Sequence, residues 1–111
     1  IFVAERLRPG RRVRFYVRDR QTSSEDLGRV LDDVSAAGQV APEGALLFSC
    51  LGRGRHLYGT PDHDASAFGA RFSDVPLAGF FAGGEIGPVG RWTYVHGYTS
   101  AFGLFRPRSR A

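Results

Sequence analysis

Four side chains in this sequence are the main candidates for chemistry: Cys50, Arg53, Glu85 and His96. A cysteine with a histidine and a carboxylate supplies the residue types of covalent catalysis, in which a thiolate needs a base and the base needs an orienting group. An arginine and a glutamate facing one pocket suit a different task, because a guanidinium grips a carboxylate bidentately and a glutamate takes an ammonium group. The first pattern predicts an enzyme, and the second predicts a site for a zwitterion such as an amino acid.

The spacing favours binding over catalysis. If the chain reverses symmetrically at Pro88-Val89, Glu85 faces Trp92, and His96 lies farther along the same face, roughly 13 Å away at the rise of a strand. A Glu–His pair then needs a bulge that shifts the register. No segment matches a known nucleophile signature, and a free cysteine is most often a small buried hydrophobe. We therefore expect a protein that is not an enzyme.

Glycines accompany both halves of the candidate binding site. Gly52 lets backbone N–H groups approach a ligand next to Arg53, and Gly84 directly precedes Glu85. The segment around Cys50 ends an apolar strand, and open sheets often bind ligands beyond strand ends. The alternative is an Arg53–Glu85 ion pair that only holds two loops together.

The remaining polar and aromatic residues give weaker signals. The cysteine and the three histidines do not follow zinc-site spacings, so we expect no metal and no cofactor. The Gly-Arg-Gly-Arg loop lacks the Lys-Ser/Thr pair of a phosphate-binding loop. We interpret the aromatic stripe as a core face and not as a stacking platform; it comprises Trp92, Tyr94 and Tyr98, with Phe80 and Phe81 nearby.

Composition describes one compact domain of 111 residues with a net charge of +4. All fifteen basic residues are arginines, and many lie at 6–20 and in the tail at 106–110. A solvated edge strand and a disordered tail explain these clusters, so nucleic acid and membrane are not expected partners. The single cysteine excludes an intrachain disulfide. The chain shows no signal peptide and begins without Met, so we expect a cytoplasmic piece of a longer protein.

The spacing of apolar residues along the chain predicts the helices and strands that position the candidate residues. Alternation at residues 13–17 predicts a strand with one buried face. A helix is expected to begin at Ser23 or Ser24 and to end at Gly38, with an apolar stripe at i, i+3, i+4 and i+7. Residues 44–51 form an almost continuous apolar run, typical of a strand covered on both faces. Strand, helix and strand suit a right-handed crossover, although an antiparallel arrangement remains open.

The second half reads as one short helix followed by strands. Residues 52–61 are expected as a loop, and a weaker helix begins at Asp62 or Asp64 and runs to Phe72. Residues 77–86 and 91–105 predict strands on either side of a turn at 87–90, with glycine bends. The whole predicts an α+β domain, with a mixed, largely antiparallel sheet of about four to six strands and two helices packed on it.

Three ordered blocks resemble the FIST C domain. The family carries Cys-x-Gly-Arg after an apolar strand, then Pro-Leu-x-Gly-Phe followed by Gly-Glu-Ile, then His-x-x-Thr. The stretch from Arg8 to Asp19 also resembles the opening strand of the family, so the resemblance covers roughly residues 2–105. The blocks here are Phe48-Ser-Cys-Leu-Gly-Arg-Gly-Arg55, Pro76-Leu-Ala-Gly-Phe-Phe-Ala-Gly-Gly-Glu-Ile-Gly-Pro88 and His96-Gly-Tyr-Thr99.

The resemblance implies a cytoplasmic sensory domain at residues 1–105, followed by an Arg/Pro-rich tail at 106–111. It implies a small ligand such as an amino acid, a FIST N domain that this chain lacks, and an output signalling domain or protein. We expect Arg53 to hold an anionic ligand group and Glu85 a cationic one. Two alternatives are an interaction module that recruits an acidic partner and a Cys-dependent hydrolase or transferase. The expected site comprises Cys50, Gly52, Arg53, Gly84, Glu85, His96 and Thr99.

Overall fold

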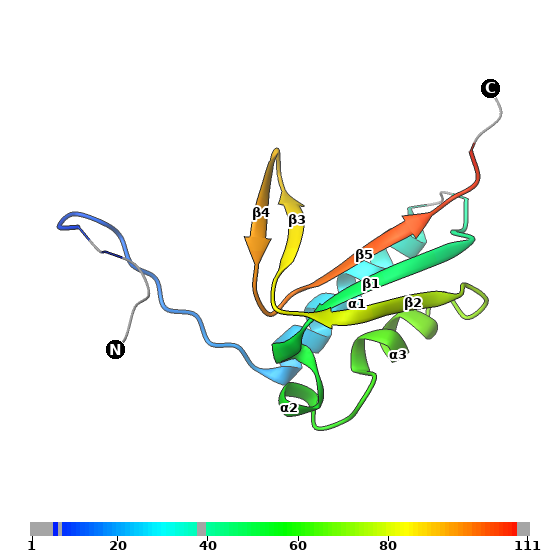
Figure 1. The fold of residues 1–111 in the computed structure, drawn as a ribbon, viewed down its shortest axis with the longest axis horizontal. Coiled ribbons are helices and arrows are strands. Elements are labelled where there is room, and N and C mark those ends of the chain that lie inside the picture. The colour runs from blue at the N-terminus through cyan, green and yellow to red at the C-terminus, as the bar shows by residue number, and fades with distance from the viewer. Residues whose placement is uncertain (1–5, 7, 38–39, 109–111) are drawn as a thin grey trace.

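The computed structural model describes residues 6, 8–37 and 40–108. Its centre is a three-stranded sheet in the order β2-β1-β5 (Figure 1). The central strand β1 (Gly44–Cys50) pairs in parallel with β2 (Leu77–Ala82) and antiparallel with β5 (Ser100–Phe105). A separate antiparallel hairpin is formed by β3 (Glu85–Val89) and β4 (Trp92–His96). The α+β class is confirmed, but the strands of the described residues are divided between a sheet and a hairpin.

Two helices pack on one face of the sheet, as expected. Leu27 and Leu31 of α1 (Arg20–Ala36) meet Ala45 of β1 and Phe68 of α3 (His63–Gly69) in the buried core. The 3-10 turn η1 (Leu51–Arg53) and the single turn α2 (Arg55–Tyr58) connect β1 to α3. The parallel crossover from β1 to β2 therefore runs through α3. The opposite face of the sheet carries Phe48 and Phe80, whose rings meet edge to face.

Helix α1 begins four residues before Ser24, at Arg20. Asp19 is the N-cap: its carboxylate accepts hydrogen bonds from the Thr22 backbone N–H at 2.9 Å and from the Thr22 hydroxyl at 2.8 Å. Aspartate is as good an N-cap as serine, so the serines lie inside the helix, where their hydroxyls contact other elements. Gly38, the expected end of this helix, lies outside the described residues.

Residues 11–19 form an extended arm, and the strand expected at 13–17 is absent. Val13, Phe15 and Val17 are 45%, 73% and 89% exposed, and Figure 1 shows the arm leaving the body of the domain. Alternation reports which side chains share a face, but it does not supply the neighbouring strand that hydrogen bonding requires. The arm and the hairpin both project, so the radius of gyration is 16.5 Å, against about 13 Å for a compact chain of this length.

The hairpin turns at Gly90 and Arg91, two residues later than expected. Val89 pairs with Trp92, and Gly90 has φ 62, as the first loop position of a type II′ turn requires. Glu85 is consequently paired with His96 and not with Trp92. The expected separation of the glutamate and the histidine was therefore wrong, because Pro88 lies within the strand and not in the turn.

The aromatic stripe is largely exposed in this structure. Trp92 is 63% exposed, and Tyr94, Tyr98, Phe80 and Phe81 are exposed as well. Its interpretation as a core face was wrong, because the hairpin stands away from the sheet (Figure 1). Within the described part of the chain, no helix has the length and apolar character needed to cross a bilayer.

Candidate functional site

The three sequence blocks meet at the carboxyl end of β1. The Cys50 backbone N–H donates to the Thr99 carbonyl at 2.9 Å. The Thr99 hydroxyl donates to Oε2 of Glu85 at 2.8 Å, and Glu85 lies opposite His96 in the hairpin. The fold thus brings together four of the residues expected to form a site.

Glu85 is the most unusual member of this group. Its side chain is 2% exposed, and its Oε2 also lies 3.4 Å from the Thr99 backbone nitrogen. Its Oε1 is buried without a hydrogen-bond partner among the described residues. An unsatisfied buried polar group costs about 1–3 kcal/mol. A donor from a ligand or from another polypeptide segment would remove this cost.

The other members of the group are occupied by protein contacts. Cys50 is buried, and Nε2 of His96 donates to the Gly87 carbonyl at 3.0 Å. A Cβ added to Gly52 would lie 2.4 Å from the Tyr98 ring, so this glycine admits an aromatic ring of the protein itself. Gly84 lies against the His96 backbone, where a Cβ would be 3.4 Å from the carbonyl oxygen.

Arg53 is the centre of a second, buried polar cluster. Its Nε and Nη2 donate to the two carboxylate oxygens of Asp64 at 2.8 and 3.0 Å. Its Nη1 donates to the Ser23 hydroxyl at 2.9 Å and to the Tyr98 carbonyl at 3.3 Å. These bonds use four of the five N–H donors of a guanidinium. The acidic partner of Arg53 is therefore Asp64, and the alternative Arg53–Glu85 ion pair is not formed.

Asp64 accepts hydrogen bonds from several sides. Ser49 donates to its Oδ2 at 2.9 Å, Ser100 donates to the same oxygen, and Nδ1 of His63 lies 2.9 Å from Oδ1. Burial raises the pKa of Asp64, but the hydrogen bonds from Arg53, Ser100 and His63 and the charge of Arg53 outweigh it and lower the pKa to about 2. Asp64 is therefore a charged carboxylate held in the interior.

Ser24, His63 and Asp64 have the residue types of a hydrolase triad, but Ser24 lies inside α1 and lines neither of the two pockets described below. Its hydroxyl oxygen lies 2.8 Å from the Arg20 carbonyl oxygen and 2.8 Å from Nε2 of His63. These contacts hold α1 to α3.

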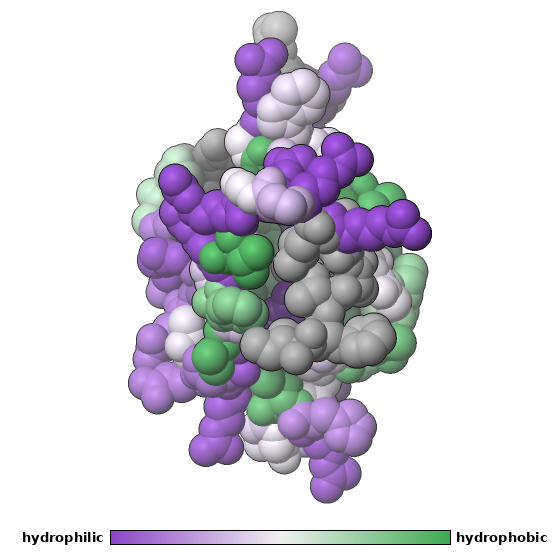
Figure 2. All heavy atoms as spheres, turned by 90° about the vertical axis from the view of Figure 1, so that its left-hand side faces the viewer, coloured by the Kyte–Doolittle hydropathy of each residue, from purple (hydrophilic) through white to green (hydrophobic). Residues whose placement is uncertain are grey.

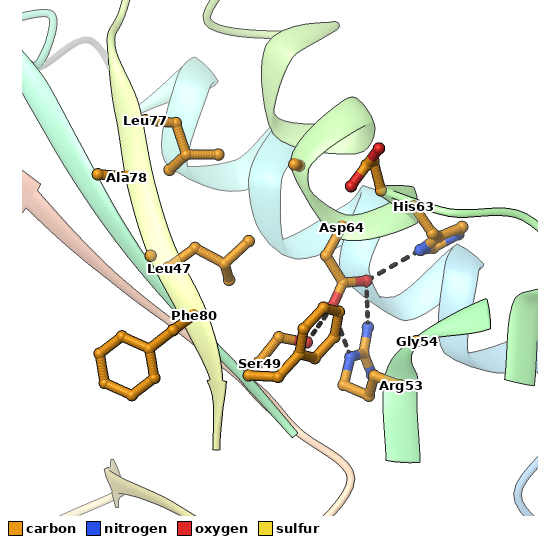
Figure 3. A pocket seen from close by; sticks show the side chains of 13 residues that line it. Leu47, Ser49, Arg53, Gly54, His63, Asp64, Leu77, Ala78 and Phe80 are labelled. Carbon is orange, nitrogen blue, oxygen red and sulfur yellow. Dashed lines mark hydrogen bonds and ion pairs between the residues drawn. The ribbon is translucent and has the colours of Figure 1, made fainter. Parts of the chain in front are cut away.

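A pocket of about 220 Å³ lies above this cluster, between β2 and α3. Leu47, Leu77 and Phe81 are among its apolar lining residues. Figure 3 shows Leu47 and Leu77 on the same side of the strands as Asp64, and the Arg53–Asp64 pair is part of the lining. The carboxylate and the guanidinium are already bound to each other, so they offer little to a polar ligand.

A second pocket, of about 360 Å³, lies between α1 and β5. One end is polar and includes Ser23, Arg53 and Thr99. The other end is apolar; it includes Leu27, Val30 and Phe102. Arg53 lines both pockets and forms the partition between them. Of the seven expected residues, Arg53 and Thr99 line this second pocket, and Glu85 reaches it through Thr99.

Charges of both signs lie at the second pocket. The Arg18 guanidinium sits 4.2 Å from the centre of the Tyr98 ring, and no ion pair engages Arg18 within the described ranges. Asp26 also lines the pocket and pairs with Arg29 on the exposed side of α1. Sequence reasoning missed Arg18, Asp26 and Asp64. Within the same described ranges, no group of three or more His, Cys, Asp or Glu side chains is arranged to hold a metal ion.

Comparisons with known proteins support the resemblance. A family model described as the FIST C domain matches residues 1–88, which include the first two of the three blocks. An uncharacterized protein of Mycobacterium tuberculosis is 43% identical over 105 residues, which are 95% of this chain and 27% of that protein. An uncharacterized protein of Mycobacterium bovis is 41% identical over the same shares of both chains. The chain thus spans about a quarter of the length of these curated relatives.

Proposed function

The chain belongs to the FIST C domain family, a family of sensory signal-transduction domains, and on this premise we propose that it forms the C-terminal lobe of a small-ligand sensor. The remaining lobe would be a FIST N domain, and the signal would pass to an output domain or protein in the same cytoplasmic polypeptide. The relatives are nearly four times as long as the matched segment, which leaves room for both.

One observation carries the proposal. Arg53 and Thr99 come from different sequence blocks, yet both line the pocket between α1 and β5. Its volume of about 360 Å³ lies in the range of small-molecule sites, which are about 300–1,000 Å³. The lining also offers hydroxyl groups and charges of both signs, which is the set that a free amino acid requires.

The residue roles differ from those first expected for the site. Arg53 has one N–H donor left, so it serves as a wall that holds Ser23 and the Tyr98 carbonyl in place. Arg18 would bind the ligand carboxylate, since its guanidinium contacts a ring face and keeps its N–H edge available. Asp26 would take the ammonium group. Glu85 would act through Thr99, whose hydroxyl it orients.

We also propose that the domain is not an enzyme. Cys50 is buried, and no hydrogen bond joins its sulfur to a base among the residues described. Catalytic cysteines sit in partly exposed, electropositive surroundings that favour the thiolate. Modification of Cys50 by iodoacetamide at neutral pH should therefore be slow in the folded protein and fast in urea. Rapid labelling of the folded chain would return the Cys-dependent hydrolase to consideration.

A thermal-shift screen of the chain against the twenty amino acids and small carboxylates tests the binding proposal. A ligand at a hundred times its dissociation constant stabilises the folded state by about 2.7 kcal/mol, which raises the melting temperature measurably. Replacing Arg18→Gln should weaken binding of a hit about tenfold or more, since a charge-assisted bond is worth about 1.5–3 kcal/mol.

Arg55→Gln is the matched control, because Arg55 is exposed on α2 and does not line the pocket. Equal affinity in the Arg18→Gln and Arg55→Gln variants would contradict the assignment of the anion site. A folded chain that responds to no compound in the screen would contradict the proposal that this lobe binds an amino acid by itself.

A further inference from the structure

The outer edge of β5 lies beside an apolar groove. β5 pairs with β1 on one side, and none of the described strands pairs with its other edge. The groove is the apolar end of the second pocket, and Val30 on its α1 wall is still 49% exposed. An open edge presents a row of unpaired N–H and C=O groups. This edge and groove can therefore accept an extended segment.

The arm has the pattern that such an edge binds. Residues 11–19 are already extended and exposed, and their apolar side chains alternate with arginines and a tyrosine. A strand added to a sheet edge gains main-chain hydrogen bonds, and every second side chain enters the groove. Figure 2 views the molecule from the side of the arm and shows hydrophobic side chains among strongly hydrophilic ones on this face.

The order of the elements identifies which edge fits the arm. Helices α1 and α3 lie on the same face of the sheet, and the chain passes from β1 through α3 to the parallel strand β2. Crossovers of this kind share one hand in about 98% of cases. A strand that precedes α1 and runs parallel to β1 must then lie on the side of β1 opposite to β2. That side is occupied by β5, so the arm fits the outer edge of β5.

The alternation also sets a register. Ser100 faces the helices, since it bonds Asp64, and Phe102 and Leu104 pack against the core on the same face. Antiparallel pairing can place all three apolar arm residues on this face. The expected pairs are Val17 with Ser100, Phe15 with Phe102, and Val13 with Leu104. Within one copy, Val17 and Ser100 line one pocket, so the test must distinguish pairing within a copy from pairing between copies.

The opposite face of this pairing has space for the larger arm side chains. Tyr16 would lie opposite Ala101, and Arg14 opposite Gly103. A Cβ built on Gly103 is 4.0 Å from its nearest neighbour, so this position is open. An aromatic side chain across from a small residue is a favourable cross-strand arrangement in sheets.

The connection between the arm and α1 determines whether the arm pairs with β5 of its own copy or with β5 of a second copy. Only Arg18 and Asp19 separate Val17 from the helix, and both are held, Arg18 on the Tyr98 ring and Asp19 as the N-cap. In this geometry the arm points away from its own β5 (Figure 1). Short, constrained hinges favour the exchange of elements between copies.

We propose that residues 12–17 of one copy add as an antiparallel strand to the outer edge of β5 in a second copy, with reciprocal exchange. Opposite charges assist the approach, because residues 11–18 carry four arginines and α1 carries four carboxylates and two arginines. The exchange completes a four-stranded sheet in each copy and covers Val30. The exchanged strand adjoins the proposed ligand site, because Val17 and Arg18 line the same pocket, but its test measures a link between copies and not ligand binding.

Disulfide trapping between two singly substituted chains tests the exchange. Paired residues on neighbouring strands lie about 4.5–5.5 Å apart between Cα atoms, within the disulfide range of about 4.4–6.8 Å. An Arg14→Cys chain mixed with a Gly103→Cys chain should form a mixed dimer under mild oxidation, with the link between positions 14 and 103 identified by mass spectrometry. Cys50 is buried and stays in place, and the unmodified chain supplies the blank.

The matched control moves the first cysteine by one residue. A Val13→Cys chain presents its thiol on the other face of the strand, so its mixture with Gly103→Cys should form at least tenfold less mixed dimer. Equal trapping in both mixtures would show random collision and overturn the proposal. A link formed only within the doubly substituted Arg14→Cys, Gly103→Cys chain would show that the arm folds onto its own edge, and would also overturn it.

Light scattering supplies a readout without cysteines. The chain should have the mass of two copies at tens of micromolar, and Phe15→Asp should return it to the mass of one, because an aspartate would enter the apolar groove. A single-copy mass for the unmodified chain at that concentration would overturn the exchange.

Discussion

Replacing Asp64 with asparagine tests how much the buried Arg53–Asp64 pair stabilises the domain. Asparagine keeps the shape of the side chain but removes its charge. Arg53, only 7% exposed, would then remain in the interior without a counter-charge. Removing one partner of a buried ion pair costs about 3–5 kcal/mol. Because a domain has about 5–15 kcal/mol of total stability, the Asp64→Asn variant should unfold at a much lower urea concentration.

The pH dependence of stability gives a second estimate of how much the Asp64 carboxylate stabilises the folded state. The pKa of Asp64 falls from 3.8 to about 2 in the folded state. The unfolded chain therefore binds the proton more tightly than the folded chain. At about 1.36 kcal/mol per unit of pKa, this carboxylate contributes about 2 kcal/mol of stability. The contribution is fully present above pH 4 and is lost as the pH falls toward 2.

Urea unfolding followed by far-ultraviolet circular dichroism measures both quantities. The difference in unfolding free energy between the original chain and Asp64→Asn should be large at pH 7 and should narrow by about 2 kcal/mol between pH 4 and pH 2. Asp32→Asn is the control, since Asp32 pairs with Arg71 on the surface at 2.6 Å, and surface pairs contribute little. An Asp64→Asn variant as stable as the control, or a difference that stays constant with pH, would refute the reasoning.

Three further outcomes are expected. Gly79→Ala should destabilise the sheet by about 1–3 kcal/mol in urea unfolding, because its Cβ would lie 1.9 Å from a backbone carbonyl oxygen of β1. Gly83→Ala is the control: its Cβ would meet nothing within 4 Å, so its effect on stability should be nearly neutral. Thr99→Val should lower stability by about 1–3 kcal/mol, because Glu85 loses its hydroxyl donor; Thr99→Ser should restore it, and equal loss in both variants would contradict this role. Gly52→Ala should displace the tyrosine ring that covers it, and an unchanged near-ultraviolet circular dichroism spectrum would contradict that contact.

The elements that depend on local pattern could be predicted from the sequence. The apolar run of β1 and the stripe of α1 were predicted because burial on one face leaves a regular trace along the chain. The weak second helix was also predicted, although it ends at Gly69 and not at Phe72. The three blocks identified the family, and they do meet at one end of β1.

The contacts that depend on tertiary geometry could not be predicted. Arg53 binds Asp64, which lies eleven residues away in the sequence. Both Asp64 and Glu85 are carboxylates, so residue type alone did not show which of them pairs with Arg53. The sequence offered two positions for the hairpin turn, Pro88-Val89 and Gly90-Arg91. Choosing the first, two residues too early, gave Glu85 the wrong partner. Alternation at residues 13–17 predicted a strand that is absent from the structure, because alternation does not supply the neighbouring strand with which it would pair.

The position of the hairpin has a practical consequence for spectroscopy. The chain contains a single tryptophan, Trp92, and it lies exposed on a hairpin that stands away from the helices and the sheet (Figure 1). Its emission should already resemble that of an indole in water, and should change little when the core melts. The same fluorophore should respond strongly when another surface covers the hairpin. In this domain, tryptophan fluorescence is therefore a poor probe of unfolding and a built-in sensor of docking.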